Sequence, residues 1–232
     1  MGQVPTLQKP YLIVGGGRLA SHISHYFKLL DIPFYCWHRN HEHPLSTFLT
    51  LTEKVLLAVS DDAIEPLSET IPQKTTIHFS GALTLPKVES AHPLFTFGPD
   101  LYDLGTYRTI PFITEKGRLP FSDLFPDLPN VSYEIDAEKK PVYHAWTSIA
   151  GNFSSILIME YVKKLEAINL PPSLAKPYLT QVLKNSFQSQ TALTGPIARG
   201  DEKTIRKHLD VIEDYFKLVY ESFVNLYRKR AS

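Results

Sequence analysis

A glycine-rich turn follows the first apolar segment of the chain and opens an amphipathic segment. Its residues, Gly15-Gly16-Gly17-Arg18-Leu19-Ala20, fit the pattern G-x-G-x-x-A. In that pattern the first glycine permits a tight turn, the second lets the backbone approach a pyrophosphate, and the small last residue lets helix and strand pack closely. Because an expected strand precedes the turn and an expected helix follows it, we predict a dinucleotide site here. The alternative is a turn with only a structural role.

The residues after the second predicted strand indicate which dinucleotide is bound. An NAD site usually has Asp or Glu about 20 residues after the glycines, where the carboxylate binds the ribose 2′-hydroxyl. Here residues 36–40 read Cys-Trp-His-Arg-Asn, without a carboxylate. Arg39, with His38 beside it and Arg18 in the glycine turn, can bind a 2′-phosphate through paired guanidinium hydrogen bonds. The sequence therefore favours NADP as the cofactor, the alternative being that Arg39 is a solvated loop residue.

Two further turns are expected to lie near the nicotinamide, after the third and fourth predicted strands. Their residues are Val59 and Ser60 in one turn and Ser80 and Gly81 in the other. The histidines at 38, 41 and 43 have no recognisable ligand spacing, so we predict no metal site.

A helix expected over residues 142–168 carries an uncharged polar stripe. At 100° per residue, His144, Ser148 and Asn152 share one side of that helix, and Pro141 to Met159 contains no Asp, Glu, Lys or Arg. A histidine can donate or accept a proton near neutral pH, so we predict that His144 is catalytic and that Ser148 and Asn152 orient the reacting group. The alternative is a helix buried on both sides, with its polar groups satisfied internally.

Three more residues are candidates for substrate contacts. Arg199, in the segment 192–201 between two predicted helices, can hold a carboxylate, and we add Thr194 from the same segment. The alternative is an ordinary turn in which Asp201 caps the next helix. His92, expected in a loop beyond the fourth strand, is the third candidate, with a structural histidine as the alternative. Cys36 is expected to be a core residue.

These sites require two kinds of structural element. Residues 1–140 alternate short apolar runs with helical patterns, which predicts an α/β domain with a Rossmann-like, mostly parallel sheet covered on both faces. Residues 141–232 predict a smaller all-helical domain, with helices over about 142–168 and 173–193 and a last helix after Asp201. The last helix shows one apolar stripe, at Leu209, Ile212, Phe216, Val219, Phe223 and Leu226.

Composition excludes several classes of protein. Lys plus Arg and Asp plus Glu both number 24, so the formal net charge of zero argues against a nucleic-acid or anionic-membrane binder. No apolar run reaches the roughly 18 residues of a membrane helix, and the first ten residues lack the pattern of a secretory signal. With Cys36 as the single cysteine, we expect a soluble cytoplasmic protein.

Several motifs together resemble a family of uncharacterised bacterial proteins. They comprise Gly15–Ala20, Val59–Ile64, His78–Ala82, His92–Leu94, Tyr143–Ala145 with Asn152, and Thr194–Asp201. The resemblance implies a Rossmann-like NADP-binding domain followed by a helical domain of unknown function. More distantly the chain resembles ketopantoate reductase, pyrroline-5-carboxylate reductase and prephenate dehydrogenase. Ketopantoate reductase has a catalytic lysine at the position that His144 takes in this chain, and this difference argues against ketopantoate reductase activity.

These observations predict an NADP-dependent oxidoreductase. Hydride would pass between the nicotinamide and a C=O or C=N carbon of a small, carboxylate-bearing substrate. The apolar stripe of the last helix, together with the resembled reductases, predicts a homodimer formed through the helical half. The alternative function is a non-catalytic NADP-binding sensor or interaction protein.

Overall fold

A computed structural model describes residues 9–71, 74–189 and 193–231. The chain divides into two compact units, Met1–Ser154 and Ser155–Ser232, each described by itself below. The boundary between the units lies within the helical segment that begins near residue 140, because the first part of that segment packs with the sheet. Part of the segment 192–201, at Ala192, and the end of the helix predicted over 173–193 lie outside the described residues.

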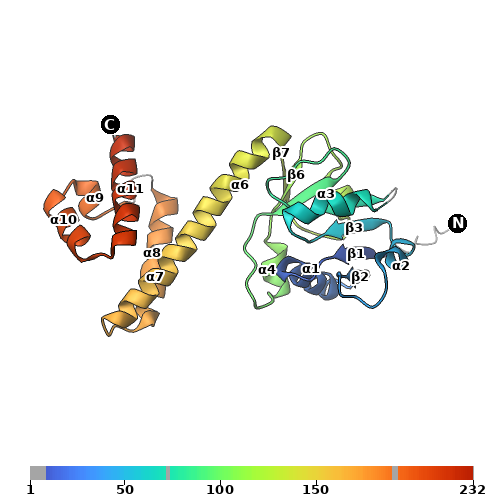
Figure 1. Cartoon of the computed structure of the whole chain (residues 1–232), viewed down its shortest axis with the longest axis horizontal. Helices are drawn as coiled ribbons and strands as arrows, with labels where there is room; N and C mark the ends of the chain where they lie inside the picture. Colours follow the sequence, from blue (N-terminus) through green and yellow to red (C-terminus); the bar gives the residue numbers. More distant parts are fainter. Residues whose placement is uncertain (1–8, 72–73, 190–192, 232) are drawn as a thin grey trace. The chain divides into compact units, whose positions relative to one another are not determined.

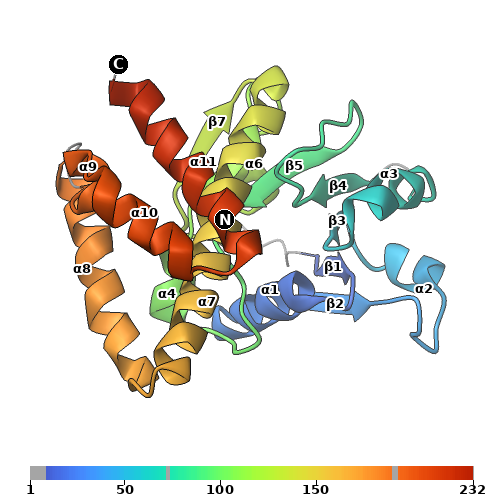
Figure 2. The ribbon, with the colours of Figure 1, turned by 60° about the vertical axis from the view of Figure 1, so that its left-hand side comes forward.

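The first unit is built on one seven-stranded sheet, ordered β2-β1-β3-β4-β5-β6-β7. Strands β1 to β5 run parallel, whereas β6 is antiparallel to β5, and β7 is parallel to β6. Figure 2 shows β1, β3 and β4 side by side. The strands are β1 (Tyr11–Val14), β2 (Phe34–Trp37), β3 (Lys54–Leu57), β4 (Thr75–His78), β5 (Glu89–Pro93), β6 (Phe112–Glu115) and β7 (Ser132–Ile135).

Two apolar layers hold helices on both faces of this sheet. Residues alternate in strand β1, so Tyr11 and Ile13 point to one layer while Leu12 and Val14 point to the other. The first layer includes α1 (Arg18–Leu29), α4 (Leu104–Arg108) and α5 (Phe121–Leu124), and the second includes α2 (Leu45–Leu49) and α3 (Asp61–Glu69). This confirms the predicted Rossmann-like, mostly parallel sheet domain, and Figure 1 shows its elements.

The order of the strands places a crevice at the carboxyl ends of the neighbouring strands β1 and β3. From β1 the chain goes to β2 on one side, and it later returns to β3 on the other. At such a reversal the loops leaving the carboxyl ends of the two strands turn apart, and ligands bind between them. The glycine turn after β1 therefore lies at the position where this type of sheet binds its ligand.

A continuous helical segment leads from the first unit into the second. It consists of α6 (Lys140–Ser148), the π-helical turn η2 (Ile149–Phe153) and α7 (Ser154–Ala167). The predicted helix over 142–168 is thus present, but its middle turn is wider than an α-helical turn. Short 3-10 turns, η1 (Ala137–Lys139) and η3 (Pro172–Leu174), precede α6 and α8.

The second unit is helical, and its last segment corrects one prediction. Its further helices are α8 (Ala175–Gln188), α9 (Pro196–Arg199), α10 (Glu202–Val211) and α11 (Asp214–Ala231). The single last helix predicted from the apolar stripe is wrong, because the backbone becomes extended at Ile212 and separates α10 from α11. Asp201 does cap α10 as predicted, since its side chain accepts a hydrogen bond from the Thr204 amide.

Two other local predictions differ from the structure. Cys36 is exposed, because β2 is the edge strand of the sheet, so the prediction of a core cysteine is wrong. His92 lies in β5 and not in a loop. Within the described ranges, no helix combines the length and the apolar character needed to span a bilayer.

Candidate functional site

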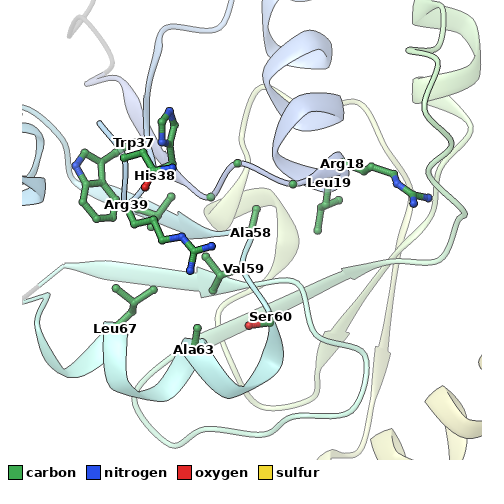
Figure 3. A pocket seen from close by; sticks show the side chains of 15 residues that line it. Arg18, Leu19, Trp37, His38, Arg39, Ala58, Val59, Ser60, Ala63 and Leu67 are labelled. Atoms are coloured by element: carbon green, nitrogen blue, oxygen red, sulfur yellow. The ribbon is translucent and has the colours of Figure 1, made fainter. Parts of the chain in front are cut away.

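A cavity of about 840 Å³ opens beside the glycine turn (Figure 3). Its walls come from the carboxyl ends of β1, β2 and β3, from the first turn of α1 and from the first two turns of α3. The lining residues are Val14, Gly15, Gly16, Gly17, Arg18, Leu19, Trp37, His38, Arg39, Asn40, Ala58, Val59, Ser60, Ala63 and Leu67. Nine of the predicted cofactor contacts are among them: Gly15, Gly16, Gly17, Arg18, Leu19, His38, Arg39, Val59 and Ser60.

The three glycines form a backbone cradle in this cavity. Gly15 has a φ of +144°, and a Cβ atom there would lie 2.1 Å from the carbonyl oxygen of Ala58, so only glycine fits. A Cβ atom on Gly17 would meet nothing within 4 Å, which leaves open space above the start of α1. Gly17 caps α1 without a side-chain hydrogen bond. Open space beside a helix N-terminus is what a pyrophosphate requires.

The charged side chains of the cavity are basic. Arg39 and Arg18 lie on opposite sides of the glycine turn, and the Arg39 guanidinium extends toward Val59 and Ala63 (Figure 3). The lining described above contains neither Asp nor Glu. The residues present therefore fit a dinucleotide that carries a phosphate on the ribose 2′-oxygen, and they lack the carboxylate that would bind a free 2′-hydroxyl.

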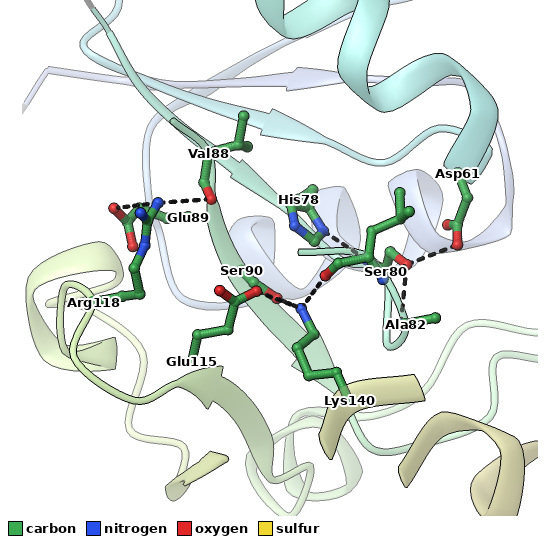
Figure 4. Close-up of polar contacts among 11 residues, drawn as sticks. Asp61, His78, Ser80, Ala82, Val88, Glu89, Ser90, Glu115, Arg118 and Lys140 are labelled. Carbon is green, nitrogen blue, oxygen red and sulfur yellow. Dashed lines mark hydrogen bonds and ion pairs between the residues drawn. The ribbon is translucent and has the colours of Figure 1, made fainter. Parts of the chain in front are cut away.

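Ala20 and Ser80 act in packing and turn formation. Ala20 is buried, so it meets the packing requirement of the motif and lies outside the cavity lining. The Ser80 hydroxyl donates to Asp61 Oδ2 at 2.7 Å and accepts from the amides of Ala82 and Leu83 at 3.2 and 3.1 Å (Figure 4). These bonds fix the turn after β4 and thereby the position of Gly81.

Gly81 lies against two histidines. A Cβ atom on this residue would be 2.4 Å from His144 Cδ2 and 3.0 Å from His92 Nε2. The two imidazole rings meet edge to face, with centroids 5.6 Å apart. His92 comes from β5 and His144 from α6, so the structure brings together three sequence-predicted residues from three separate elements.

Tyr143, for which the sequence predicted no role, joins this group. Its hydroxyl lies 2.8 Å from His92 Nδ1. Burial lowers the pKa of His92 to about 4, with the neighbouring His144 and Lys140 as further causes, and burial raises the pKa of Tyr143. His92 is therefore neutral at pH 7. In the sequence, the one indication of a role for Tyr143 is its position next to His144. Its hydrogen-bond partner, His92, lies on the distant strand β5.

A buried ion pair fastens the start of α6 to the sheet (Figure 4). Lys140, only 2% exposed, donates to Glu115 Oε1 and Ser90 Oγ, both at 2.7 Å, and to the carbonyl oxygen of Leu83. Glu115 is also buried. This pair is not predictable from the sequence, because nothing local distinguishes a buried lysine from a solvated one.

His78, on β4, is a second buried neutral histidine. Its Nδ1 accepts the Ser80 amide hydrogen at 3.2 Å, and burial, with Lys140 and Arg118 as lesser causes, lowers its pKa to about 3. Among the described residues its Nε2 atom has no hydrogen-bond partner. It supports the turn that carries Ser80 and Gly81.

The remaining predicted residues lie on α6, on η2 and in the second unit. Ser148 ends α6 and is half-buried, whereas Asn152 is exposed within η2, where the wider π-helical turn departs from the regular 100° spacing. The opposite, apolar side of the segment is exposed: Trp146 by 61% and Phe153 by 53%. Thr194 and Arg199 are exposed residues of the second unit.

Solved structures from several organisms share this fold. BF3122 of Bacteroides fragilis, a "putative NADP oxidoreductase", is 19% identical with a TM-score of 0.78, and the alignment covers 96% of this chain and 98% of that one. TM1727 of Thermotoga maritima is 22% identical, with a TM-score of 0.63 and coverage of 94% and 97%. Pyrroline carboxylate reductase of Plasmodium falciparum, solved with NADP bound, is 13% identical, with a TM-score of 0.59 and coverage of 96% and 97%.

At these identities the comparisons show the fold alone, which this chain shares with solved structures of NADP oxidoreductases. No curated protein matches the sequence. The model of one family, described as a domain of unknown function (DUF2520), matches residues 114–230. That match confirms the expected uncharacterised family, and the chain belongs to the DUF2520 family.

Proposed function

We propose that this protein is an NADP-dependent oxidoreductase. The observation that carries the proposal is the cavity at the glycine turn, where Arg39 occupies the region in which an NAD site would have a carboxylate. When bound, the nicotinamide would exchange hydride with a C=O or C=N carbon of a small, carboxylate-bearing substrate. The likeness to NADP oxidoreductases supports this class of reaction.

The course of the cofactor follows from the order of the strands. A 2′-phosphate at Arg39 and a pyrophosphate at Gly15–Gly17 define a line from the end of β2 to the end of β1. Continued in the same direction, that line passes Val59 and Ser60 after β3 and arrives at Gly81 after β4. The nicotinamide would therefore lie near Gly81 and the two histidines packed against it.

His144 is our candidate for proton transfer. Within the described part of the chain, its ring nitrogens have no hydrogen-bond partner, so they are free to meet a substrate. His92 would contact the substrate from β5. Ser148 and Asn152 as orienting groups, and Arg199 and Thr194 as carboxylate contacts, complete the proposed site.

We also propose that the protein is a cytoplasmic homodimer that pairs through its helical unit. Several apolar side chains in the described part of the second unit are largely exposed, such as Val211 by 80% and Leu218 by 69%. A small helical unit with so much exposed apolar surface gains stability by pairing with a second copy. The free, exposed thiol of Cys36 suits a reducing compartment.

The test of the cofactor assignment is calorimetry with NADP and NAD. We expect tighter binding of NADP, and we expect Arg39→Ala to remove most of the difference, about tenfold to hundredfold, because bonds to a charged phosphate are lost. Arg206→Ala, which changes an exposed arginine of α10, is the matched control. Equal affinities in the unaltered protein, or a preference for NAD, would refute the assignment.

A further inference from the structure

The contact between Tyr143 and His92 suggests a specific role for each. We propose that His92 donates a hydrogen bond from Nε2 to the oxygen of a carbonyl substrate, and that Tyr143 is a positioning residue that fixes the required tautomer. This inference rests on the proposed function and narrows its substrate class from C=O or C=N compounds to C=O compounds.

The chemistry of the Tyr143–His92 hydrogen bond sets the tautomer. The two atoms, Tyr143 Oη and His92 Nδ1, are 2.8 Å apart, and either could carry the shared hydrogen. A phenol is a far stronger acid than a neutral imidazole N–H, and an imidazole nitrogen is a stronger base than a phenol oxygen. The phenol therefore donates to Nδ1. A neutral ring that accepts at Nδ1 carries its single hydrogen on Nε2.

The Nε2–H group of His92 is left without an acceptor. This atom lies beside Gly81, 3.0 Å from where a Cβ atom would be. Among the described residues, none forms a hydrogen bond with His92 Nε2. The atom is also accessible to solvent, whereas the unpartnered Nε2 atom of His78 is buried. A donor that is positioned but unused, next to the turn where the nicotinamide is proposed to lie, suits an acceptor atom of the ligand.

The neutral state of His92 decides which acceptor that is. The groups that face it are Tyr143 and His144 from α6, Lys140 at the start of α6, and Asp61 from α3, and His92 is half-buried among them. A neutral N–H donor stabilises the negative charge that develops on a carbonyl oxygen. A protonated imine has no lone pair to accept such a bond, so the donor favours a carbonyl.

In the resulting step the carbonyl carbon gains hydride from the reduced cofactor, which is oxidised. The C=O π electrons move to the oxygen, which His92 Nε2–H holds by a hydrogen bond. His144 gives a proton to that oxygen, which completes the alcohol, and afterwards takes up a proton from solvent. Tyr143 keeps its own proton throughout, in keeping with the raised pKa of its hydroxyl.

The first test is ¹⁵N NMR of the His92 ring in the full-length protein at pH 7. We expect Nδ1 to resonate as an unprotonated nitrogen and Nε2 as a protonated one, and we expect Tyr143→Phe to produce a mixture of tautomers. Tyr133→Phe, which changes an exposed tyrosine of β7, should leave the His92 signals unchanged. An unprotonated Nε2 in the unaltered protein would overturn the inference.

The second test is NADPH-dependent reduction of a panel of 2-oxo acids and of cyclic imino acids. We expect turnover of 2-oxo acids only, a loss of about 10²–10³-fold in kcat for His92→Phe, and a loss of about threefold to tenfold for Tyr143→Phe. The affinity for NADPH, measured by calorimetry, should stay unchanged in both variants.

The outcomes separate the inference from the proposed function. Turnover of imines alone, no turnover of any carbonyl compound by a protein that binds NADPH, or an unchanged kcat in Tyr143→Phe would overturn the inference while the NADP site stands. Failure to bind NADPH would instead refute the proposed function.

Discussion

Gly15 and Gly81 both follow parallel strands at the carboxyl edge of the sheet, and a Cβ atom fits at neither position. At Gly15 the obstacle is backbone, because the carbonyl oxygen of Ala58 lies 2.1 Å from the Cβ position and φ is +144°. At Gly81 the obstacle is the side chains of His144 and His92, and φ is not in the left-handed region.

This difference separates a binding turn from a reacting turn. The Gly15 turn is open, because Gly16 and Gly17 are exposed and the cavity lies directly beside them. The Gly81 turn is buried among titratable side chains. These include the neutral histidines His78 and His92 and the buried ion pair of Lys140 with Glu115. Backbone shape thus defines the first turn, whereas side-chain chemistry from three elements defines the second.

The largest effect on this comparison is expected from breaking the ion pair beneath the Gly81 turn. Glu115→Ala leaves the Lys140 ammonium buried without its counter-charge, and we expect the free energy of unfolding to fall by about 3–5 kcal/mol. Urea denaturation measures the change. The double variant Glu115→Leu with Lys140→Met, which removes both charges, should regain most of the loss; if it does not, the charges are not the cause.

Gly15→Ala tests the backbone obstacle at the first turn. Strain from the positive φ and the contact with Ala58 should together cost about 3 kcal/mol. Gly17→Ala is the matched control, since its Cβ atom has room and its φ is −87°. We expect the control to retain its stability in urea but to bind NADP less tightly, because the added methyl group occupies the cradle.

Gly81→Ala tests the side-chain obstacle at the second turn. The histidine rings can move, so we expect a smaller loss of about 1–3 kcal/mol. Adding His144→Ala removes the ring nearest to the new methyl group and should restore part of that stability, a coupling that a double-mutant cycle measures. Additive effects of the two substitutions would show that the His144 ring is not the obstacle.

The pH dependence of stability tests the two neutral histidines that support the Gly81 turn. His78 and His92 have folded-state pKa values of about 3 and about 4, below the usual 6.5, so between these values and 6.5 the unfolded chain binds more protons. The free energy of unfolding should therefore decrease as pH falls from about 6.5 toward 4, by up to about 1.4 kcal/mol per pH unit for each histidine. His92→Phe should reduce this slope in urea denaturation between pH 6.5 and 5, and an unchanged slope would contradict it.

Prediction from sequence succeeded where the determinants are local. The strands β1 and β2 and the glycine turn between β1 and α1 follow from apolar runs and glycine spacing. It failed at two positions: Cys36 is exposed because β2 is an edge strand, and α10 ends at Val211 although the apolar periodicity continues through Ile212. Periodicity reports which residues can share a face, but it does not report a break in the backbone.

The sequence by itself determined the order of the elements, the glycine cradle and the basic residue Arg39 at the end of β2, because each depends on residues close together along the chain. Only the tertiary structure decided that Gly81, His92, Tyr143 and His144 meet, and that Lys140 is buried against Glu115. The physical reason is that sheet order and helix packing bring together residues from separate elements of the chain, and that burial then shifts the pKa of some of them. His92 is an ordinary histidine in the sequence, and its burial in the fold lowers its pKa to about 4.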